Sequence, residues 1–417
     1  MKILVVGIAY APEIISTGLY NTGMCEGLAA RGNAVSIITT VPYYPQWRVW
    51  QGWRGMRWRR ERENDVDVTR VPVYVPAKPT GLRRIALYFS FLCSAFLPAL
   101  ARAWRDRPDV VIAIAPTLIA APLALLCARI SGAKALIHVQ DFEVGAALGT
   151  GLLDKQGIIA RLAGWFEQTI IRRFDLATSI SPQMCRRLAW LRGSDADIYQ
   201  LRNWSDTNAV MPLDRPSIFR DRWNIKTPHV VLYAGNLGNK QGIEILTHVA
   251  AVLAPRGDVT VVICGEGPAR DGLARAATGI PNIRMEPLQD ITQLSDLLGL
   301  ATLHVIPQRP QVADMVLPSK LTNIFASGRP VIVTAESDTG LAHEIEGAGV
   351  VVPPEDPDAL AGAIAALLDD PTKRTALGCE ARQKAERDWG REMILDRFDD
   401  WLHVAVGVPN RLSGEIH

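Results

Sequence analysis

Short apolar runs alternate with helical patterns along this chain, and the alternation starts twice. The first series begins with KILVVGIAY and includes DVVIAIAP and AKALIHVQD, and the second begins with HVVLYAGNLG and includes DVTVVICGEGP and RPVIVTA. Uniformly apolar runs are typical of strands buried on both faces, and intervening helices make such strands parallel. The sequence therefore predicts an α/β protein with two consecutive doubly wound, Rossmann-like domains.

The chain length supports more than one domain, because 417 residues exceed one ordinary hydrophobic core. MPLDRP interrupts the periodicity near residues 208–216. We predict an N-terminal domain at 1–207, a second domain at 208–390, and a segment at 391–417 whose final helix packs back on the first domain. Open α/β sheets bind ligands at the carboxyl ends of their strands, so two facing sheets predict a central cleft.

Composition narrows the class of protein. A net charge of +2 argues against a general polyanion or nucleic-acid binder, and any basic function must be local. The six cysteines are far apart, without the close pairs of a zinc or redox site, so we expect reduced thiols in the cytosol. The acidic residues form no DxD pair after a strand and the histidines are scattered, so no catalytic metal and no cofactor are predicted.

Two glycine-containing loops follow predicted strands. Gly18 opens the helix after the first strand, where free backbone N–H groups attract phosphate; a glycine that only turns the chain is an equal alternative. In LYAGNLGNKQG, the loop contains Gly235, Asn236 and Lys240, and a lysine in such a loop can neutralise a departing diphosphate. Here we favour a ligand-binding loop over a solvated lysine.

The second half contains two further candidate sites. CGEGP places Gly265 and Glu266 after a strand, either as a surface for a base or ribose or simply as a tight turn. In VLPSKLTNIFASGRPVI, a helix that begins near Ser319 has that residue as its cap, Lys320 in its first turn and Asn323 on the same face. A lysine at a helix N-terminus is unfavourable unless an anion lies beside it, which predicts a phosphate or nucleotide partner.

The first domain has its own polar strand end in IHVQDFEVG. Asp141 is the first candidate to orient an acceptor hydroxyl or to take its proton, and His138 is the second. A lone histidine on an apolar strand is more often a core residue that is already hydrogen-bonded, and that alternative is favoured for His138.

The order of these motifs resembles a known family. SxSP, RNWSD, GNLGxKQG, GEGP, LPSKLTNxxASGRPVI and VVVPPEDPDALAGAIAALLDDPTKR occur in one order over nearly the whole chain. The chain is thus identified as similar to the retaining GT-B glycosyltransferases of family 4. It is most similar to the branch that assembles bacterial exopolysaccharide and O-antigen, the colanic-acid and N-acetylfucosaminyl transferase type.

The resemblance implies a nucleotide-sugar donor, UDP- or GDP-linked, held mainly by the second domain, and metal-independent transfer with retention of configuration to an acceptor held by the first. Gly18 then faces the donor diphosphate, Lys240 stabilises the departing phosphate, and Asp141 orients the acceptor. Met315 and Asn323 replace two glutamates that are usual in the family. Two alternatives stay open: an epimerase of the same fold, and a non-catalytic nucleotide-sugar-binding subunit.

One segment of the first domain indicates a membrane surface. YYPQWRVWQGWRGMRWRR, residues 43–60, contains no acidic residue, and residues 85–101 are uncharged. Indoles favour the headgroup level and guanidinium groups pair with lipid phosphates. The family resemblance implies that the acceptor is a polyprenyl-diphosphate-linked saccharide at the bacterial inner membrane, so we predict a peripheral protein on the inner face of that membrane. The contact residues are 85–101 with Trp47, Trp50, Trp53, Arg54, Arg57 and Trp58; packing of the tryptophans on their own domain is the alternative.

Overall fold

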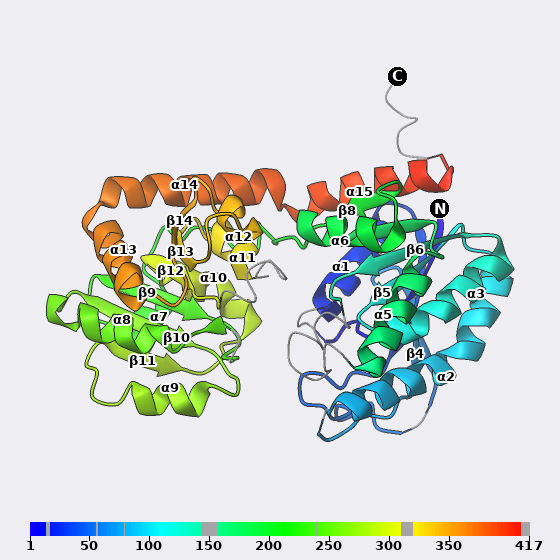
Figure 1. Cartoon of the computed structure of the whole chain (residues 1–417), viewed down its shortest axis with the longest axis horizontal. Helices are drawn as coiled ribbons and strands as arrows, with labels where there is room; N and C mark the ends of the chain where they lie inside the picture. The colour runs from blue at the N-terminus through cyan, green and yellow to red at the C-terminus, as the bar shows by residue number, and fades with distance from the viewer. Residues whose placement is uncertain are drawn as a thin grey trace. The chain divides into compact units, whose positions relative to one another are not determined.

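A computed structural model shows that the apolar runs form two parallel sheets (Figure 1). It describes residues 1–13, 17–55, 57–78, 80–142, 157–238, 241–309 and 320–409. The chain divides into two compact units. Unit 1 consists of Met1–Arg202 with Glu392–His417, and unit 2 is Asn203–Arg391.

Unit 1 contains an eight-stranded sheet in the order β3-β4-β2-β1-β5-β6-β7-β8. Neighbouring strands are parallel except for β3, which runs antiparallel to β4 at the edge. The strands are β1 (Lys2–Val6), β2 (Ala34–Thr40), β3 (Arg59–Glu63), β4 (Val66–Val71), β5 (Val110–Ala115), β6 (Lys134–Val139), β7 (Leu176–Ser179) and β8 (Ile198–Gln200). Because β1 joins β2 on one side and β5 on the other, the strand order reverses there, as in a doubly wound sheet.

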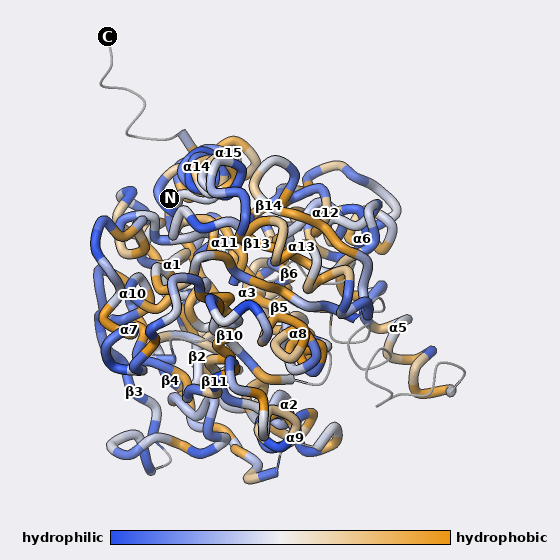
Figure 2. Tube along the Cα trace, turned by 90° about the vertical axis from the view of Figure 1, so that its left-hand side faces the viewer, coloured by the Kyte–Doolittle hydropathy of each residue, from blue (hydrophilic) through white to orange (hydrophobic). Residues whose placement is uncertain are grey.

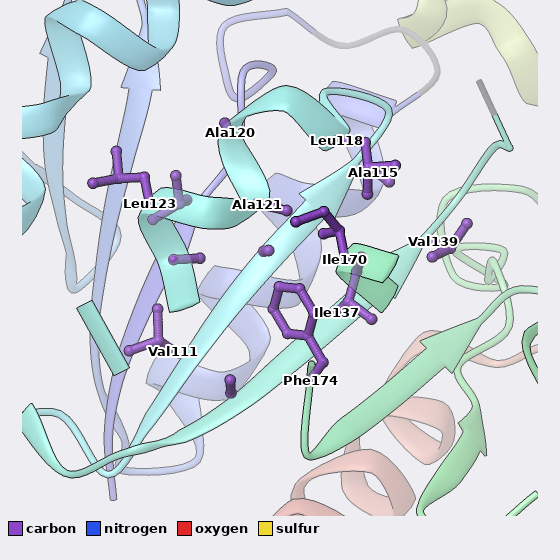
Figure 3. Packing of buried hydrophobic residues seen from close by; sticks show 14 of the residues in the cluster. Val111, Ala115, Leu118, Ala120, Ala121, Leu123, Ile137, Val139, Ile170 and Phe174 are labelled. Atoms are coloured by element: carbon purple, nitrogen blue, oxygen red, sulfur yellow. The ribbon is translucent and has the colours of Figure 1, made fainter. Parts of the chain in front are cut away.

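Helices cover this sheet on both faces. They are α1 (Thr17–Ala30), α2 (Gly81–Asp106), α3 (Ala121–Ser131), α5 (Ile158–Ile171), α6 (Pro182–Arg192) and α15 (Arg391–Val406), with a 3-10 turn η1 (Leu118–Ala120). Leu4 and Val6 share one hydrophobic cluster with residues of α2, α3, α5 and α6, part of which Figure 3 shows. Ile3 and Val5 are also buried and point to the opposite face, since side chains alternate along a strand.

The C-terminal helix α15 packs within unit 1. Arg31, at the end of α1, donates to the carboxylates of Glu392 (3.0 Å) and Asp396 (2.8 Å). Beneath these surface pairs, the buried Asn33 amide donates to Asp399 at 2.7 Å. Trp401 stacks on Tyr199 of β8 with ring centroids 4.9 Å apart. These contacts are distributed along the helix and fix it to the sheet layer.

Unit 2 contains a parallel six-stranded sheet in the order β11-β10-β9-β12-β13-β14. The strands are β9 (His229–Ala234), β10 (Val259–Cys264), β11 (Ile283–Glu286), β12 (Leu303–Ile306), β13 (Val331–Thr334) and β14 (Gly349–Val352). One face is covered by α8 (Ile245–Leu253), α9 (Arg270–Ala276) and α13 (Pro357–Asp369). The other is covered by α7 (Ile218–Arg222), α10 (Leu294–Gly299), α11 (Lys320–Ala326) and α14 (Pro371–Asp388). Shorter elements are α12 (Gly340–Glu344), η3 (Ala254–Arg256) and η4 (Ile291–Gln293).

The compact units divide after Arg202, earlier than the predicted boundary after residue 207. The reason lies in the backbone contacts of the intervening residues. The Ser205 N–H donates to the Trp389 carbonyl at 2.8 Å, and Arg382 of α14 donates to the Thr207 carbonyl at 3.0 Å. Sequence periodicity does not show these hydrogen bonds, which attach the residues to unit 2.

Candidate functional site

In unit 2, the loop after β9 and the start of α11 come together at the carboxyl edge of the sheet. The Lys320 Nζ lies 3.9 Å from the centroid of the Tyr233 ring. A Cβ on Gly235, whose φ is +141°, would lie 3.3 Å from that Nζ. The Tyr233 hydroxyl donates to the Asn236 carbonyl at 2.7 Å and fixes the loop above β9. The structure thus brings together residues of two motifs that are far apart in the sequence: Gly235 and Asn236 from one, and Lys320 from the other.

The Lys320 ammonium is enclosed without a hydrogen-bond partner among the described residues. The residue as a whole is only partly buried, but its Nζ has no contact with solvent. Burial lowers the pKa of Lys320 to about 7. A buried ammonium is unfavourable unless an anion pairs with it, and the aromatic ring offsets only part of that cost. The arrangement is therefore suited to receive a negatively charged group.

The glycines after β10 have a packing role. A Cβ on Gly265 would overlap the Gly235 carbonyl oxygen, and one on Gly267 would lie 2.5 Å from the Leu237 carbonyl oxygen. The Leu237 N–H donates to the Glu266 carbonyl at 2.8 Å, which joins the two loops. Gly265 is buried and the Glu266 side chain is exposed. Contact of these residues with a base or ribose stays a prediction, because loop packing alone accounts for the glycines.

Several predicted donor-site residues lie outside the described residues or are already paired. Lys240 and Ser319 belong to the former group, as does Met315. Asn323 lies in α11, where its side-chain oxygen accepts a hydrogen bond from the Ser205 hydroxyl at 2.9 Å. A ribose contact from Asn323 would have to share or replace that hydrogen bond.

In unit 1, the two predicted acceptor-site residues have different environments. His138 of β6 is buried, and its Nδ1 lies 2.8 Å from the Thr178 hydroxyl of β7. Burial lowers the pKa of His138 to about 4, so the imidazole is neutral near pH 7. This geometry favours a structural histidine. Asp141 lies exposed just beyond the end of β6, where a substrate can reach it; a catalytic role for either residue stays a prediction.

Gly18 packs against the loop that follows β1. A Cβ at this position would lie 2.5 Å from the carbonyl oxygen of Glu13, so no larger residue fits without a backbone shift. The buried Glu13 carboxylate accepts hydrogen bonds from the Tyr43 and Tyr44 N–H groups at 2.6 and 2.7 Å, and burial raises its pKa. The loop after β1 is thereby attached to the first residues of the segment rich in Trp and Arg at residues 43–60, called the Trp/Arg segment below. Packing is thus a second reason for a glycine at position 18, besides the predicted diphosphate contact.

A polar connection that the sequence motifs do not predict crosses the carboxyl edge of the unit 1 sheet. Asn21 of α1 is fully buried and donates to the Ala9 carbonyl at 2.9 Å. Its side-chain oxygen accepts from Gln140, just after β6, at 2.8 Å. The two residues are 119 positions apart, so no local motif indicated the pair. It holds the strand end that leads to Asp141.

The Trp/Arg segment divides into packed and exposed residues. The Trp53 ring packs against the guanidinium groups of Arg59 (4.5 Å) and Arg70 (4.7 Å), measured to the ring centroid. Arg70 is buried in β4 and pairs with Glu61 and, at 2.8 Å, with Glu63, both on β3. Trp47 packs against Tyr43 and Tyr44. For Trp47 and Trp53 the structure therefore shows the alternative, packing on their own domain.

Trp58 and the arginines beside it remain at the surface. The Trp58 side chain is 59% exposed, although its indole N–H donates to the Ser94 carbonyl of α2 at 3.1 Å. Arg54 and Arg57 are exposed. Trp50 is partly buried, and its N–H donates to Gln46 at 3.0 Å. Trp58 is thus the tryptophan of this segment that has most of its surface in solvent, and it lies directly beside α2.

Helix α2 buries one stripe and exposes other apolar side chains. Every fourth residue is buried in the core: Leu87, Phe91, Ala95, Ala99 and Ala103. Large apolar side chains elsewhere on the helix are exposed: Leu82, Ile85, Phe89, Phe96, Leu97 and Trp104. By length and composition alone the helix is apolar enough to cross a membrane. Its buried stripe instead makes α2 a layer of unit 1 with an apolar outer face.

A second apolar helix face occurs on α5, which the sequence analysis did not single out. Ile158, Ile159, Leu162 and Trp165 are all more than half exposed. Their spacing places them on one side of the helix, while Ile170 and Ile171 at the other end belong to the core cluster. Figure 2 shows hydrophobic stretches along both α2 and α5. Exposed large side chains grouped in this way mark an interaction surface.

Within the described residues, no group of His, Cys, Asp and Glu side chains is arranged to hold a metal ion.

Comparison with known proteins assigns the two halves of the chain. Residues 17–204 match the family described as "Glycosyl transferase 4-like domain", and residues 228–370 match "Glycosyl transferases group 1". The "Putative colanic acid biosynthesis glycosyl transferase WcaI" of Escherichia coli K12 is 37% identical over 95% of this chain and 98% of its own length. A similarity of this extent includes both units.

Solved structures share the fold at low sequence identity. Sucrose-phosphate synthase from Thermosynechococcus elongatus has a TM-score of 0.75 at 18% identity, covering 97% of this chain and 99% of its own. The Anabaena protein HepE, solved in complex with UDP-glucose, has a TM-score of 0.68 at 15% identity, covering 97% and 100%. The predicted GT-B fold, with two Rossmann-like domains, is thereby confirmed.

Proposed function

Because this chain belongs to the group 1 glycosyl transferases with a glycosyl transferase 4-like first domain, we propose that it transfers a sugar from a nucleotide-sugar donor in bacterial exopolysaccharide or lipopolysaccharide assembly. The acceptor in this proposal is a saccharide linked to a polyprenyl diphosphate, and the anomeric configuration is retained without a metal. The observation that carries the proposal is the similarity to the colanic acid transferase over 95% of the chain.

Unit 2 is the proposed donor-binding unit. Its Gly235 loop and the enclosed Lys320 ammonium lie at the carboxyl edge of a parallel sheet, the edge at which such folds bind nucleotides. An anionic diphosphate would supply the partner that Lys320 lacks among the described residues. That HepE was solved with UDP-glucose supports a donor of this class.

In the proposed reaction the site stabilises the departing phosphate, and no covalent intermediate forms. In our proposal Lys240 and Lys320 hold the negative charge that develops on the diphosphate as the glycosidic bond breaks. The diphosphate accepts the proton of the acceptor hydroxyl, and the exposed Asp141 orients that hydroxyl. The buried, neutral His138 is too enclosed to take part directly.

The test is donor binding followed by transfer. We expect UDP or GDP, but not both equally, to raise the melting temperature, since a ligand bound only to the native state stabilises it. Lys240→Ala should remove this shift and slow transfer roughly a hundredfold. Lys226→Ala, which alters an exposed lysine of the same unit, is the matched control.

Other outcomes would identify the alternative functions. An altered sugar released from donor without any acceptor would show an epimerase instead. Nucleotide binding with no turnover on lipid-linked saccharides would show a non-catalytic subunit, consistent with the replacement of the usual glutamates by Met315 and Asn323. NMR of the anomeric proton of the product tests retention.

We place the enzyme in the cytoplasm, with unit 1 bound to the inner face of the membrane. The apolar outer face of α2, the α5 face and Trp58 supply insertion at headgroup depth. Exposed arginines beside them, Arg54, Arg57, Arg83 and Arg161, match the negative charge of anionic lipids. Such a surface would keep the acceptor unit beside a lipid-linked substrate.

A further inference from the structure

A cavity of about 640 Å³ opens in unit 2 at the amino edge of the sheet. Its wall includes His229 at the start of β9, Thr302 just before β12 and Pro330 just before β13. The candidate donor site is at the carboxyl end of the same sheet. A strand the length of β9 is roughly 20 Å long, so the two sites are separate.

Five arginines line this cavity: Arg215, Arg220, Arg329, Arg374 and Arg382. Arg215 pairs with Asp296 at 2.9 Å and Arg382 with Glu386 at 2.6 Å. The other three arginines have no ion pair with any described carboxylate. Those three guanidinium groups therefore have no directly contacting carboxylate within the described part of the unit.

The three remaining guanidinium groups are held in place by backbone carbonyls. Arg220 donates to the Thr227 and Pro228 carbonyls, each at 2.8 Å. Arg374 donates to the carbonyls at the end of α13, 2.7 Å from that of Leu368. Carbonyl contacts orient a guanidinium without removing its charge, and each guanidinium carries more N–H donors than these contacts use.

Arg329 is near enough to Arg220 and Arg374 to be affected by both charges, and its hydrogen bonding is the least complete of the three. One of its terminal nitrogens donates to the Gly299 carbonyl at 3.1 Å, while its buried Nε has no partner among the described residues. Burial and the neighbouring charges of Arg220 and Arg374 lower the pKa of Arg329. Like charges this close raise the energy of the folded unit, and a bound anion reverses that effect.

We propose that this cavity binds a small phosphorylated anion with several negative charges, at a site separate from the donor site. Its volume fits a small molecule. The planar, fork-shaped guanidinium group is suited to phosphate oxygens, which it can bind in pairs. The phosphorylated compound class includes inorganic diphosphate, sugar phosphates and free nucleotides.

The test uses inorganic pyrophosphate in isothermal titration calorimetry. The double variant Arg329→Gln with Arg374→Gln should weaken pyrophosphate binding at least about tenfold. The matched control is Arg387→Gln, which alters an exposed arginine of α14 outside the cavity and should leave the affinity unchanged. Arg329→Lys keeps the charge but not the paired donors, so its affinity for pyrophosphate should be intermediate. This variant replaces the double variant if the latter does not fold.

A second pair of measurements separates this site from the donor site. Pyrophosphate binding should persist in the variant Lys240→Ala with Lys320→Met, and donor binding should persist in Arg329→Gln with Arg374→Gln. Equal affinity for citrate would overturn phosphate recognition. Pyrophosphate binding that the donor-site variant abolishes and the arginine variant retains would overturn the proposal, while the proposed transferase function would stand.

Discussion

The two units have the same architecture and different surfaces. Both contain a sheet whose strands are parallel, apart from the edge strand β3 of unit 1, with helices on each face and mostly apolar central strands. Among the described residues, the exposed tryptophans Trp58, Trp104, Trp165 and Trp190 all belong to unit 1. In unit 2 the tryptophans Trp204, Trp223 and Trp389 are buried. The similar cores therefore account for the common fold, and the different surface residues determine what each unit can bind.

The two units also differ in whether a buried cation has an anionic partner. Arg70 of unit 1 is fully buried and pairs with two glutamates of the neighbouring strand. Lys320 of unit 2 has an enclosed ammonium with no partner among the described residues. A paired buried charge contributes to a structure, while an unpaired one opposes folding and marks a ligand position. Three experiments test these two comparisons.

The largest effect should come from Arg70→Met. The change leaves Glu61 and Glu63 without their partner and removes the support of the Trp53 ring, so unit 1 should lose about 3 kcal/mol of unfolding free energy. Urea denaturation, with hydrogen exchange at β3 and β4, measures it. Arg62→Met changes an exposed arginine of the neighbouring strand β3 and should cost under about 0.5 kcal/mol. Equal losses in both variants would refute a structural role for the Arg70 network.

Lys320→Met should change the unfolding free energy in the opposite direction and stabilise the protein. The lowered pKa of Lys320, about 7, means that the folded state loses stability as pH falls from the unfolded pKa near 10.4 toward 7. Replacing the ammonium by an apolar side chain should stabilise unit 2 by about 2 kcal/mol at pH 7 and weaken nucleotide binding.

The pH dependence of this stability gain shows whether it comes from removal of the buried ammonium. Relative to wild type, the gain in Lys320→Met should shrink by up to about 1.4 kcal/mol per pH unit above pH 7. Lys226→Met, at an exposed lysine, should show neither the gain nor its pH dependence. A loss of stability in Lys320→Met at pH 7 would mean that the ammonium already has an anionic partner in the free protein.

The smallest effect should come from substitutions on the exposed apolar faces of α2 and α5. Phe89→Asp with Leu97→Asp on α2, or Ile159→Asp with Trp165→Asp on α5, should reduce flotation with phosphatidylglycerol liposomes about tenfold, because each pair removes exposed apolar side chains. Val252→Asp with Ile291→Asp makes the same change on exposed residues of unit 2 and should have no effect. Equal losses in all three variants, or none, would remove the distinction between the surfaces.

The sequence predicted what depends on local pattern. Strands such as β5 and β10 are buried along their whole length and almost entirely apolar because both faces are covered, so the pattern alone indicated them. The final helix has the predicted end at Val406. The candidate donor site followed from motif order, and the structure brings Gly235, Asn236 and Lys320 to one edge.

What could not be predicted depends on contacts between distant residues. RRERE has no apolar run, and it is a strand because Glu61 and Glu63 pair with the buried Arg70 of the next strand. The helical pattern of α5 does not show which side of it is covered. The basic cavity collects arginines from Arg215 to Arg382, and no short motif contains them together.

The position of α15 determines how the coding sequences of the two units can be separated. Unit 2 is one continuous stretch, residues 203–391, and a single pair of cuts excises it. Unit 1 is assembled from two stretches, because Arg31, Asn33 and Tyr199 hold a helix that the chain supplies only after unit 2 is complete. An exchange of unit 2 between relatives is therefore an insertion into unit 1, with two junctions to match, rather than a fusion at one.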